Sequence, residues 1–256
     1  MDGKKYKPFD GGQAAYRFLV PKEELTKDPR TLEFVKEDGK LGMVMGFDRR
    51  LVFYPCVNNT LMNFLVIHPS SETRAEGAGE FFYLDQVATC LTSRSDWNLP
   101  GDKSKMLELT KSFGPDIQAM LEKAPKDTLK VWTLLDMETM KDWTNGNMAL
   151  LGDAAHPFLP HQGQGGAQAI EDAVSLAAVL PLGTPKVDIP ERLRLYQQCR
   201  QGRANKIQDF TRTSGLSKDE LKKKGLELDR ELCAIRSTFS TNRATSESIL
   251  SLQFQP

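Results

Sequence analysis

The sequence predicts an α+β protein in which a mainly antiparallel sheet precedes a helical segment. Strand-like segments gather in the first 70 residues, and the pair Asn58-Asn59 separates two of them. After Gly146 the spacing of apolar residues becomes helical over long stretches. A run of strands followed by a run of helices is typical of α+β folds, whereas regular alternation would indicate a parallel α/β sheet.

The first part of the chain predicts strands joined by short turns and two helices. Residues 14–20 ("AAYRFLV") predict a strand. The segments "RLVFYPCV" and "TLMNFLVIH" flank Asn58-Asn59, a pair that tolerates positive φ, and therefore predict a hairpin. Further along, "KSKMLELTKSFG" and "PDIQAMLEKA" predict helices, and "LKVWTLLDM" predicts another strand.

The second part begins with "NMALL", an apolar run without alternation that predicts a short strand buried on both faces. From Gly163 the chain predicts a helix whose apolar residues should face the core, at Ile170, Val174 and Ala177. A long second helix ends at Gly215, and a charged third helix is predicted around residues 218–235.

Composition excludes several classes of function. The 256 residues carry a formal net charge of zero, so no global charge favours nucleic acid or an anionic membrane as a partner. The basic residues of the second long helix, including Arg200 and Arg203, are interpreted as a solvated surface. The four cysteines are far apart and indicate reduced thiols of a cytoplasmic protein. The N-terminus lacks a secretory apolar core, and no apolar run approaches the roughly 20 residues of a membrane span.

A metal site is not predicted. His156 and His161 lie close together in the sequence, but no acidic or cysteine partner follows at ligand spacing. Packing within the loop is the favoured role for both histidines.

The stretch "GDAAHPFLPHQGQGG" carries the clearest chemical signal. The short apolar strand delivers Asp153 at its end, where α/β proteins hold ligands. The glycines before the helix, Gly165 and Gly166 among them, let a flat or phosphorylated group approach the backbone. The helix then directs free N–H groups at that group, and the Asp153 carboxylate suits sugar hydroxyls.

The longer segment "GDAAHPFLPHQGQGGAQAIEDA" closely resembles the second FAD-binding motif of flavin-dependent aromatic hydroxylases, the salicylate-hydroxylase-like monooxygenases common in fungal secondary metabolism. The segments "GGQAAYRFLVP", "RLVFYPCVNNTLMNFLV" and "LYQQCRQGRANKIQDFTRTSG" occur in the family's order. The resemblance therefore covers roughly residues 9 to 215.

This resemblance implies a cofactor site. In the family the aspartate of the Gly-Asp turn contacts the ribityl or ribose region of FAD, and the glycine-rich turn lies against the isoalloxazine. The implied flavin contacts are Asp153, Gly166, Pro160 and Gly165.

The resemblance also implies two substrate contacts, Arg17 of the "YR" strand and Tyr54 of the "YP" strand. Arg17 would stabilise a phenolate, and Tyr54 would hydrogen-bond to it. The alternatives are an ordinary salt bridge for Arg17 and an ordinary sheet aromatic for Tyr54.

The family's first motif, G-x-G-x-x-G for the FAD pyrophosphate, does not occur in the sequence. The chain is therefore expected to match the C-terminal part of the family. Residues 1–140 would form a substrate-binding-type sheet domain, 141–236 a helical C-terminal remnant of the Rossmann-like FAD-binding domain, and 237–256 a disordered tail. The "NMALL" edge would then need a second chain or self-association to cover it, unless the sequence is a truncated copy.

Two functions stay open at this point. The first is an FAD-dependent monooxygenase that hydroxylates a small phenolic or polyketide-derived aromatic substrate with NAD(P)H and O2, and the intact Gly-Asp turn favours it. The second is a truncated, flavin-free descendant, acting as a binding module or a non-redox cyclase or isomerase, or an inactive fragment. The missing phosphate-binding motif favours the second.

Overall fold

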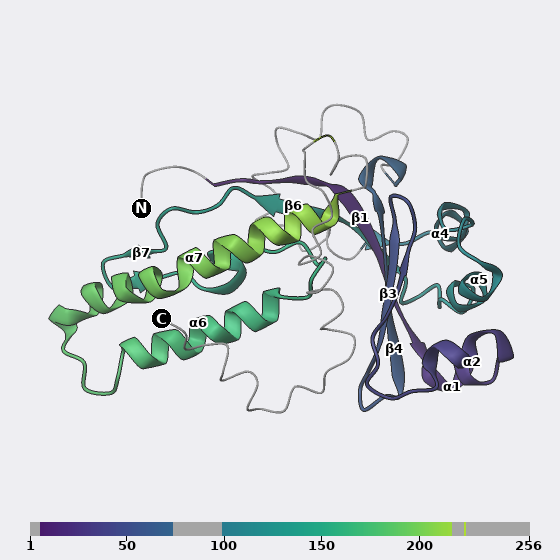
Figure 1. Ribbon diagram of the computed structural model, residues 1–256, viewed down its shortest axis with the longest axis horizontal. Coiled ribbons are helices and arrows are strands. Elements are labelled where there is room, and N and C mark those ends of the chain that lie inside the picture. Colours follow the sequence, from purple (N-terminus) through teal and green to yellow (C-terminus); the bar gives the residue numbers. More distant parts are fainter. Residues whose placement is uncertain (1–5, 74–98, 217–222, 224–256) are drawn as a thin grey trace.

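The computed structural model describes residues 6–73, 99–216 and 223 of the chain. Within them, a six-stranded antiparallel sheet has the order β2-β3-β4-β1-β6-β5, with helices on both of its faces (Figure 1). The strands are β1 (Pro8–Pro21), β2 (Gly42–Met45), β3 (Arg50–Cys56), β4 (Leu61–Pro69), β5 (Leu99–Pro100) and β6 (Lys130–Met137). The predicted α+β class and antiparallel sheet are confirmed.

The hairpin between β3 and β4 forms as the sequence predicts. Val57, Asn58 and Asn59 all have positive φ, between 49° and 63°. Asparagine tolerates this left-handed region better than most residues do. The turn sets a register in which Tyr54 lies opposite Asn63 and Phe53 opposite Phe64.

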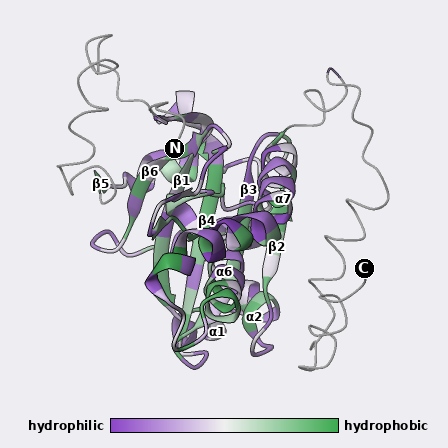
Figure 2. Cartoon of the chain, turned by 90° about the vertical axis from the view of Figure 1, so that its left-hand side faces the viewer, coloured by the Kyte–Doolittle hydropathy of each residue, from purple (hydrophilic) through white to green (hydrophobic). Residues whose placement is uncertain are grey.

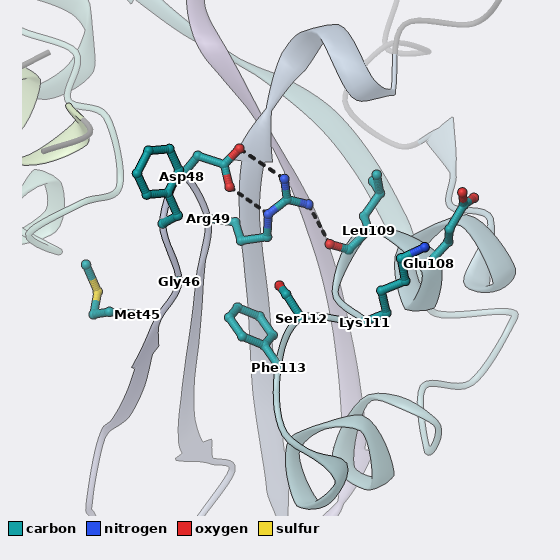
Figure 3. Close-up of a pocket in the computed structure, with 10 residues that line it drawn as sticks. Met45, Gly46, Asp48, Arg49, Glu108, Leu109, Lys111, Ser112 and Phe113 are labelled. Atoms are coloured by element: carbon teal, nitrogen blue, oxygen red, sulfur yellow. Dashed lines mark hydrogen bonds and ion pairs between the residues drawn. The ribbon is translucent and has the colours of Figure 1, made fainter. Parts of the chain in front are cut away.

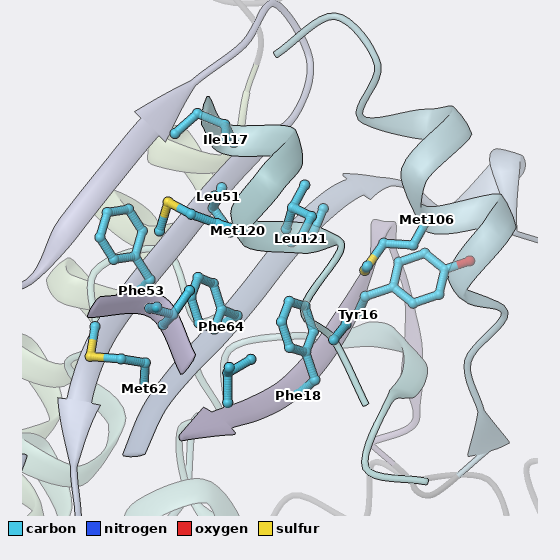
Figure 4. Close-up of a cluster of buried hydrophobic side chains, with 14 of the residues drawn as sticks. Tyr16, Phe18, Leu51, Phe53, Met62, Phe64, Met106, Ile117, Met120 and Leu121 are labelled. Atoms are coloured by element: carbon cyan, nitrogen blue, oxygen red, sulfur yellow. The ribbon is translucent and has the colours of Figure 1, made fainter. Parts of the chain in front are cut away.

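One face of the sheet carries the main hydrophobic core, because alternate residues of each strand point to the same side. Four short helices cover this face: α1 (Lys22–Thr26), α2 (Pro29–Val35), α4 (Lys103–Leu109) and α5 (Pro115–Leu121). Rings of Phe18, Phe53 and Phe64 stack in the middle of this core (Figure 4). The strands accordingly carry bands of hydrophobic residues in the view coloured by hydropathy (Figure 2).

Among the described residues, the opposite face of the sheet, which we call the open face, is covered at one end. There Ala15, Ile67 and Leu134 pack against Leu159, which belongs to the loop after the Gly-Asp turn. On this side of the sheet lie the two long helices, α6 (Gly165–Val179) and α7 (Ile189–Gly215) (Figure 1). A separate small core around Trp143 and Tyr196 holds them together.

The prediction of a buried "NMALL" strand is wrong. Only Met148–Ala149 is extended, as β8, and it pairs with β7 (Thr144–Asn145) in a two-stranded ladder. Met148 and Leu151 are exposed. Within the described residues no larger sheet borders this segment, so its apolar side chains have little to pack against.

The predicted core face of α6 is also wrong. The helix forms as expected, but Ile170 is 67% exposed, Val174 is 65% exposed and Ala177 is exposed as well. The buried residues of α6 are instead Gln168 and Asp172. The reason is that α7 presents a buried arginine to α6, and this cation requires polar partners.

The predicted third helix, apart from position 223, and the predicted tail 237–256 lie outside the described residues. Among the residues that the structure describes, no helix is long and apolar enough to cross a membrane.

Candidate functional site

The Gly-Asp turn forms a short 3-10 helix, η3 (Gly152–Ala154), two residues after β8. Gly152 has a φ of +57°, and a Cβ added there would lie 3.3 Å from the Cβ of Ala169 in α6. Both the backbone conformation and the close approach therefore require glycine. The Gly152 N–H donates to Asp172 Oδ2 at 2.9 Å, which fixes the turn against α6.

Asp172 organises the buried region behind this turn. Its carboxylate also accepts a hydrogen bond from Arg200 Nε of α7 at 2.8 Å and contacts His156 Nε2 at 2.7 Å. Asp172 and His156 are almost completely inaccessible to solvent, and Arg200 is 5% exposed. The interpretation of Arg200 as a solvated surface residue is therefore wrong, because the arginine neutralises a buried carboxylate.

The aromatic residues around this network are buried with it. The ring of Trp143 packs near those of His156 and Tyr196, with centroids 4.9 and 6.1 Å away. Burial raises the pKa of Tyr196 well above its usual value, so the hydroxyl stays protonated and donates to the Leu150 carbonyl at 3.1 Å. The residues that position the turn thus include Asp172 and Arg200, which the sequence interpretation missed. The signal was present, since Asp172 belongs to the "AIEDA" end of the motif.

The predicted flavin contacts lie together at the start of α6. The Asp153 side chain is exposed, and its Oδ1 lies 3.8 Å from the position of a Cβ added at Gly165. A Cβ added at Gly166 would meet nothing within 4 Å, so the space beside it is open. Pro160 is exposed on the loop between them.

The start of α6 leaves polar backbone groups available. The first intrahelical hydrogen bond runs from the Gln168 N–H to the Gln164 carbonyl, 2.9 Å long, and the Gln164 side chain does not cap the helix. The N–H groups of residues 165–167 precede this bond, as at any helix N-terminus. A carboxylate and a set of backbone donors thus share one exposed surface, which suits a ligand that has hydroxyl groups and hydrogen-bond acceptors.

The two predicted substrate residues lie on the open face of the sheet. The Arg17 Nε donates to Asn63 Oδ1 at 2.9 Å, and Asn63 stands opposite Tyr54 in the β3–β4 ladder. Tyr54 is 39% exposed and Arg17 is exposed, while Asn63 is buried. The structure therefore groups the two residues around a buried amide that the sequence interpretation did not single out. The alternative role for Arg17 was an ordinary salt bridge. Within the described residues, Arg17 forms no salt bridge to a carboxylate.

The Gly-Asp loop and the open face meet at the covered end of the sheet. Leu159, six residues after Asp153, packs against Ala15, two residues before Arg17 in β1. The end of α7 is held at the same place, since Arg50 Nη2 of β3 donates to the Ser214 carbonyl at 2.9 Å. The predicted flavin residues therefore lie on the side of the sheet that carries Arg17 and Tyr54, which is also the side of α6 and α7 (Figure 1).

The second histidine, His161, is buried in the loop. A Cβ added at Gly215 of α7 would come within 2.7 Å of His161 Nε2, so the imidazole packs closely against the end of α7. Within the described residues, no group of three His, Cys, Asp or Glu side chains is placed to hold a metal ion.

A hollow of about 630 Å³ lies elsewhere, between the β2–β3 turn and the segment joining α4 and α5 (Figure 3). Arg49 crosses it and is bound to Asp48 and to the Leu109 carbonyl. Hydrogen bonds to Arg49 lower the pKa of the Asp48 carboxyl. This hollow contains neither the Gly-Asp turn nor Arg17 and Tyr54, so we do not assign the predicted chemistry to it.

Comparison with known proteins places these features in a family context. The FAD binding domain family matches residues 108–211. An FAD-dependent monooxygenase of Diaporthe leptostromiformis, phomE', is 33% identical over 206 residues, covering 80% of this chain and 48% of the relative. The salicylate hydroxylase of Pseudomonas putida is 30% identical over 210 residues, covering 81% of this chain and 45% of the enzyme. The chain thus spans about half the length of the curated relatives it matches.

The fold has solved counterparts. A substrate complex of salicylate hydroxylase superposes with a TM-score of 0.66 at 23% identity, covering 97% of this chain and 58% of that chain. The structure of CtdE with FAD and its substrate gives a TM-score of 0.63 at 24% identity, covering 82% of this chain and 48% of that chain. At these identities the likeness extends to the fold alone.

Proposed function

We propose that this chain, a relative of the salicylate-hydroxylase-like FAD-dependent monooxygenases, contributes the substrate sheet and the Gly-Asp half of the flavin site to an aromatic hydroxylase. The substrate would be a phenolic or polyketide-derived ring, with NAD(P)H and O2 as co-substrates, in a cytoplasmic secondary-metabolite pathway. The observation that carries the proposal is the grouping of Arg17, Asn63 and Tyr54 on the open face, on the side of the Gly-Asp loop.

The residues at the start of α6 fit one part of FAD. The exposed Asp153 carboxylate suits the hydroxyls of a ribityl or ribose chain, and the backbone donors of residues 165–167 suit the polar edge of a flat ring. The open space beside Gly166 allows such a ring to approach the backbone. When bound, FAD supplies the redox and oxygen chemistry.

The residues of the open face would bind and orient the substrate. Arg17 favours the phenolate form of a phenol, which makes the ring more electron-rich. Asn63 accepts a hydrogen bond from the guanidinium Nε of Arg17, and the two outer nitrogens would donate to the substrate. Tyr54 offers a hydroxyl that either donates to the phenolate or accepts from the phenol.

We also propose that a second polypeptide covers the exposed apolar side of α6. Ile170, Val174 and the neighbouring Leu151 are exposed together with Met148, a larger apolar group than a surface helix usually presents. The relatives are about twice as long as the matched region, which supports a partner that carries the remaining half of an FAD site.

A visible-absorbance titration of the full 256-residue chain with FAD tests the proposed function. We expect a saturable shift of the flavin band. Asp153→Asn should raise the Kd about tenfold or more, since a hydrogen bond to a charged group contributes roughly 1.5–3 kcal/mol. Asp127→Asn, at an exposed residue in the loop before β6, is the matched control and should leave the Kd unchanged.

Two results would contradict the proposal. Well-folded protein that does not shift the flavin band, alone or with a partner that supplies the other half, would exclude a flavoenzyme and favour the flavin-free binding module. Equal weakening by Asp153→Asn and Asp127→Asn would remove Asp153 from the cofactor site.

A further inference from the structure

We infer that Lys130 acts with Arg17 as a second substrate-binding cation, and that the substrate carries an anionic group, a carboxylate or phenolate, bound between them. The inference deepens the proposed function and rests on it for the identity of the ligand as an aromatic substrate. Its structural basis is the register of two strands.

The β1–β6 ladder places Arg17 directly opposite Lys130. Residues opposed in an antiparallel pair point to the same face, with Cβ atoms about 4.5–5.5 Å apart. Lys130 therefore stands on the open face beside Arg17, on the side away from Asn63, which lies in β4. Lys130 is half-buried, so the stem of its side chain packs on the sheet.

Like charges directly opposite one another destabilise a sheet unless an anion neutralises them. Many cations of the described residues have such a partner. Lys22 binds Asp38, for example, and Arg212 of α7 binds Asp136 of β6. Among the residues that the structure describes, neither Arg17 nor Lys130 forms a salt bridge. The hydrogen bond of Arg17 is to the neutral amide of Asn63. Among the described residues, the pair therefore presents positive charge that no carboxylate compensates.

The surroundings select the class of anion. Arg17 is opposite Leu65 on its other side, and Trp132 is the next residue of β6 on this face. Both side chains are partly buried and pack against the small core under Leu159. A compact aromatic anion satisfies the charge of the cations and the apolar surface together, whereas a phosphate or a nucleic acid would leave the apolar surface unused.

The test measures binding of salicylate, a small aromatic anion, to the 256-residue chain by the fluorescence of salicylate, with the neutral salicylamide as the matched ligand. Lys130→Gln should raise the Kd for salicylate about tenfold, which corresponds to ~1.4 kcal/mol, and should leave salicylamide binding unchanged. Lys130→Arg, which keeps the charge, should bind salicylate within about threefold of the wild type. Lys126→Gln, at an exposed lysine before β6, is the control and should have no effect.

The outcomes separate this inference from the proposed function. If Lys130→Gln binds salicylate as tightly as the wild type, or if the wild type does not bind it, the anion site is refuted, whatever the flavin titration shows. If salicylate binding depends on Lys130 while FAD does not bind, the anion site stands and the monooxygenase proposal fails. A urea midpoint lowered by Lys130→Gln would instead assign the lysine a structural role and overturn the inference.

Discussion

A single buried carboxylate, Asp172, connects the Gly-Asp turn to both long helices. It accepts a hydrogen bond from the Gly152 N–H, contacts His156 and neutralises the charge of Arg200. Each of these groups would be costly to bury without a partner. The carboxylate is therefore expected to hold the turn in place rather than to take part in chemistry, because solvent and ligands do not reach it.

Asp172→Asn should strongly destabilise the fold. The substitution leaves the Arg200 guanidinium buried without its charged partner, and breaking a buried pair in this way typically costs about 3–5 kcal/mol. Glu191→Gln is the matched control, because Glu191 pairs with Arg194 on the surface and such pairs contribute about 0–1 kcal/mol. Urea unfolding followed by circular dichroism measures both. Equal midpoints for the two variants would show that the Asp172 network does not stabilise the fold.

At the scale of elements, local signals were sufficient for the hairpin and insufficient for α6. Asn58 and Asn59 specify their turn through their own backbone preferences, so the sequence alone predicted it. The apolar spacing of α6 correctly predicted a helix. The spacing of apolar residues does not show which side of the helix another element will pack against. In this chain the neighbour is α7 with its buried Arg200, and the polar side of α6 faces it.

The pairing of Arg17 with Lys130 likewise could not be predicted from the sequence alone. The two residues are far apart along the chain, and the β1–β6 ladder that pairs them changes register between Asp10 and Gln13. A shift of one residue would place either side chain on the other face. Their motifs predict Arg17 and Tyr54 as substrate contacts, whereas the position of Asn63 beside both becomes visible only once the strands are paired.

Because the polar side of α6 is buried and its apolar side is exposed, substitutions on the apolar side should have little effect on stability. Ile170→Ser should change the free energy of unfolding of the isolated chain by less than about 0.5 kcal/mol, as expected for an exposed site. Leu193→Ala, at a buried residue of α7, should cost about 2–5 kcal/mol. Urea unfolding of dilute protein measures both changes. A large loss for Ile170→Ser would mean that the apolar side of α6 is covered in solution.

At the scale of the whole molecule, the two cores differ greatly in size. The sheet and its four short helices share the large cluster centred on Phe18 and Phe64, whereas α6 and α7 share a small one around Trp143 and Tyr196. Since stability follows buried apolar area, the helices should open at a lower free energy than the sheet. A major polar link between the two parts is Arg212, which binds the Asp136 carboxylate with two nitrogens, at 2.7 and 3.1 Å.

Hydrogen exchange followed by mass spectrometry should reveal this hierarchy. Amides of α6 should exchange faster than those of β1 and β4, the central strands. Arg212→Ala should accelerate exchange in α6 and α7 while leaving β1 and β4 unchanged, because it removes the link without touching the sheet core. Arg194→Ala, on the exposed side of α7, is the control. Uniform acceleration in all four elements would mean that the molecule opens as one cooperative unit, and that the loop carrying Asp153 cannot move independently of the face carrying Arg17.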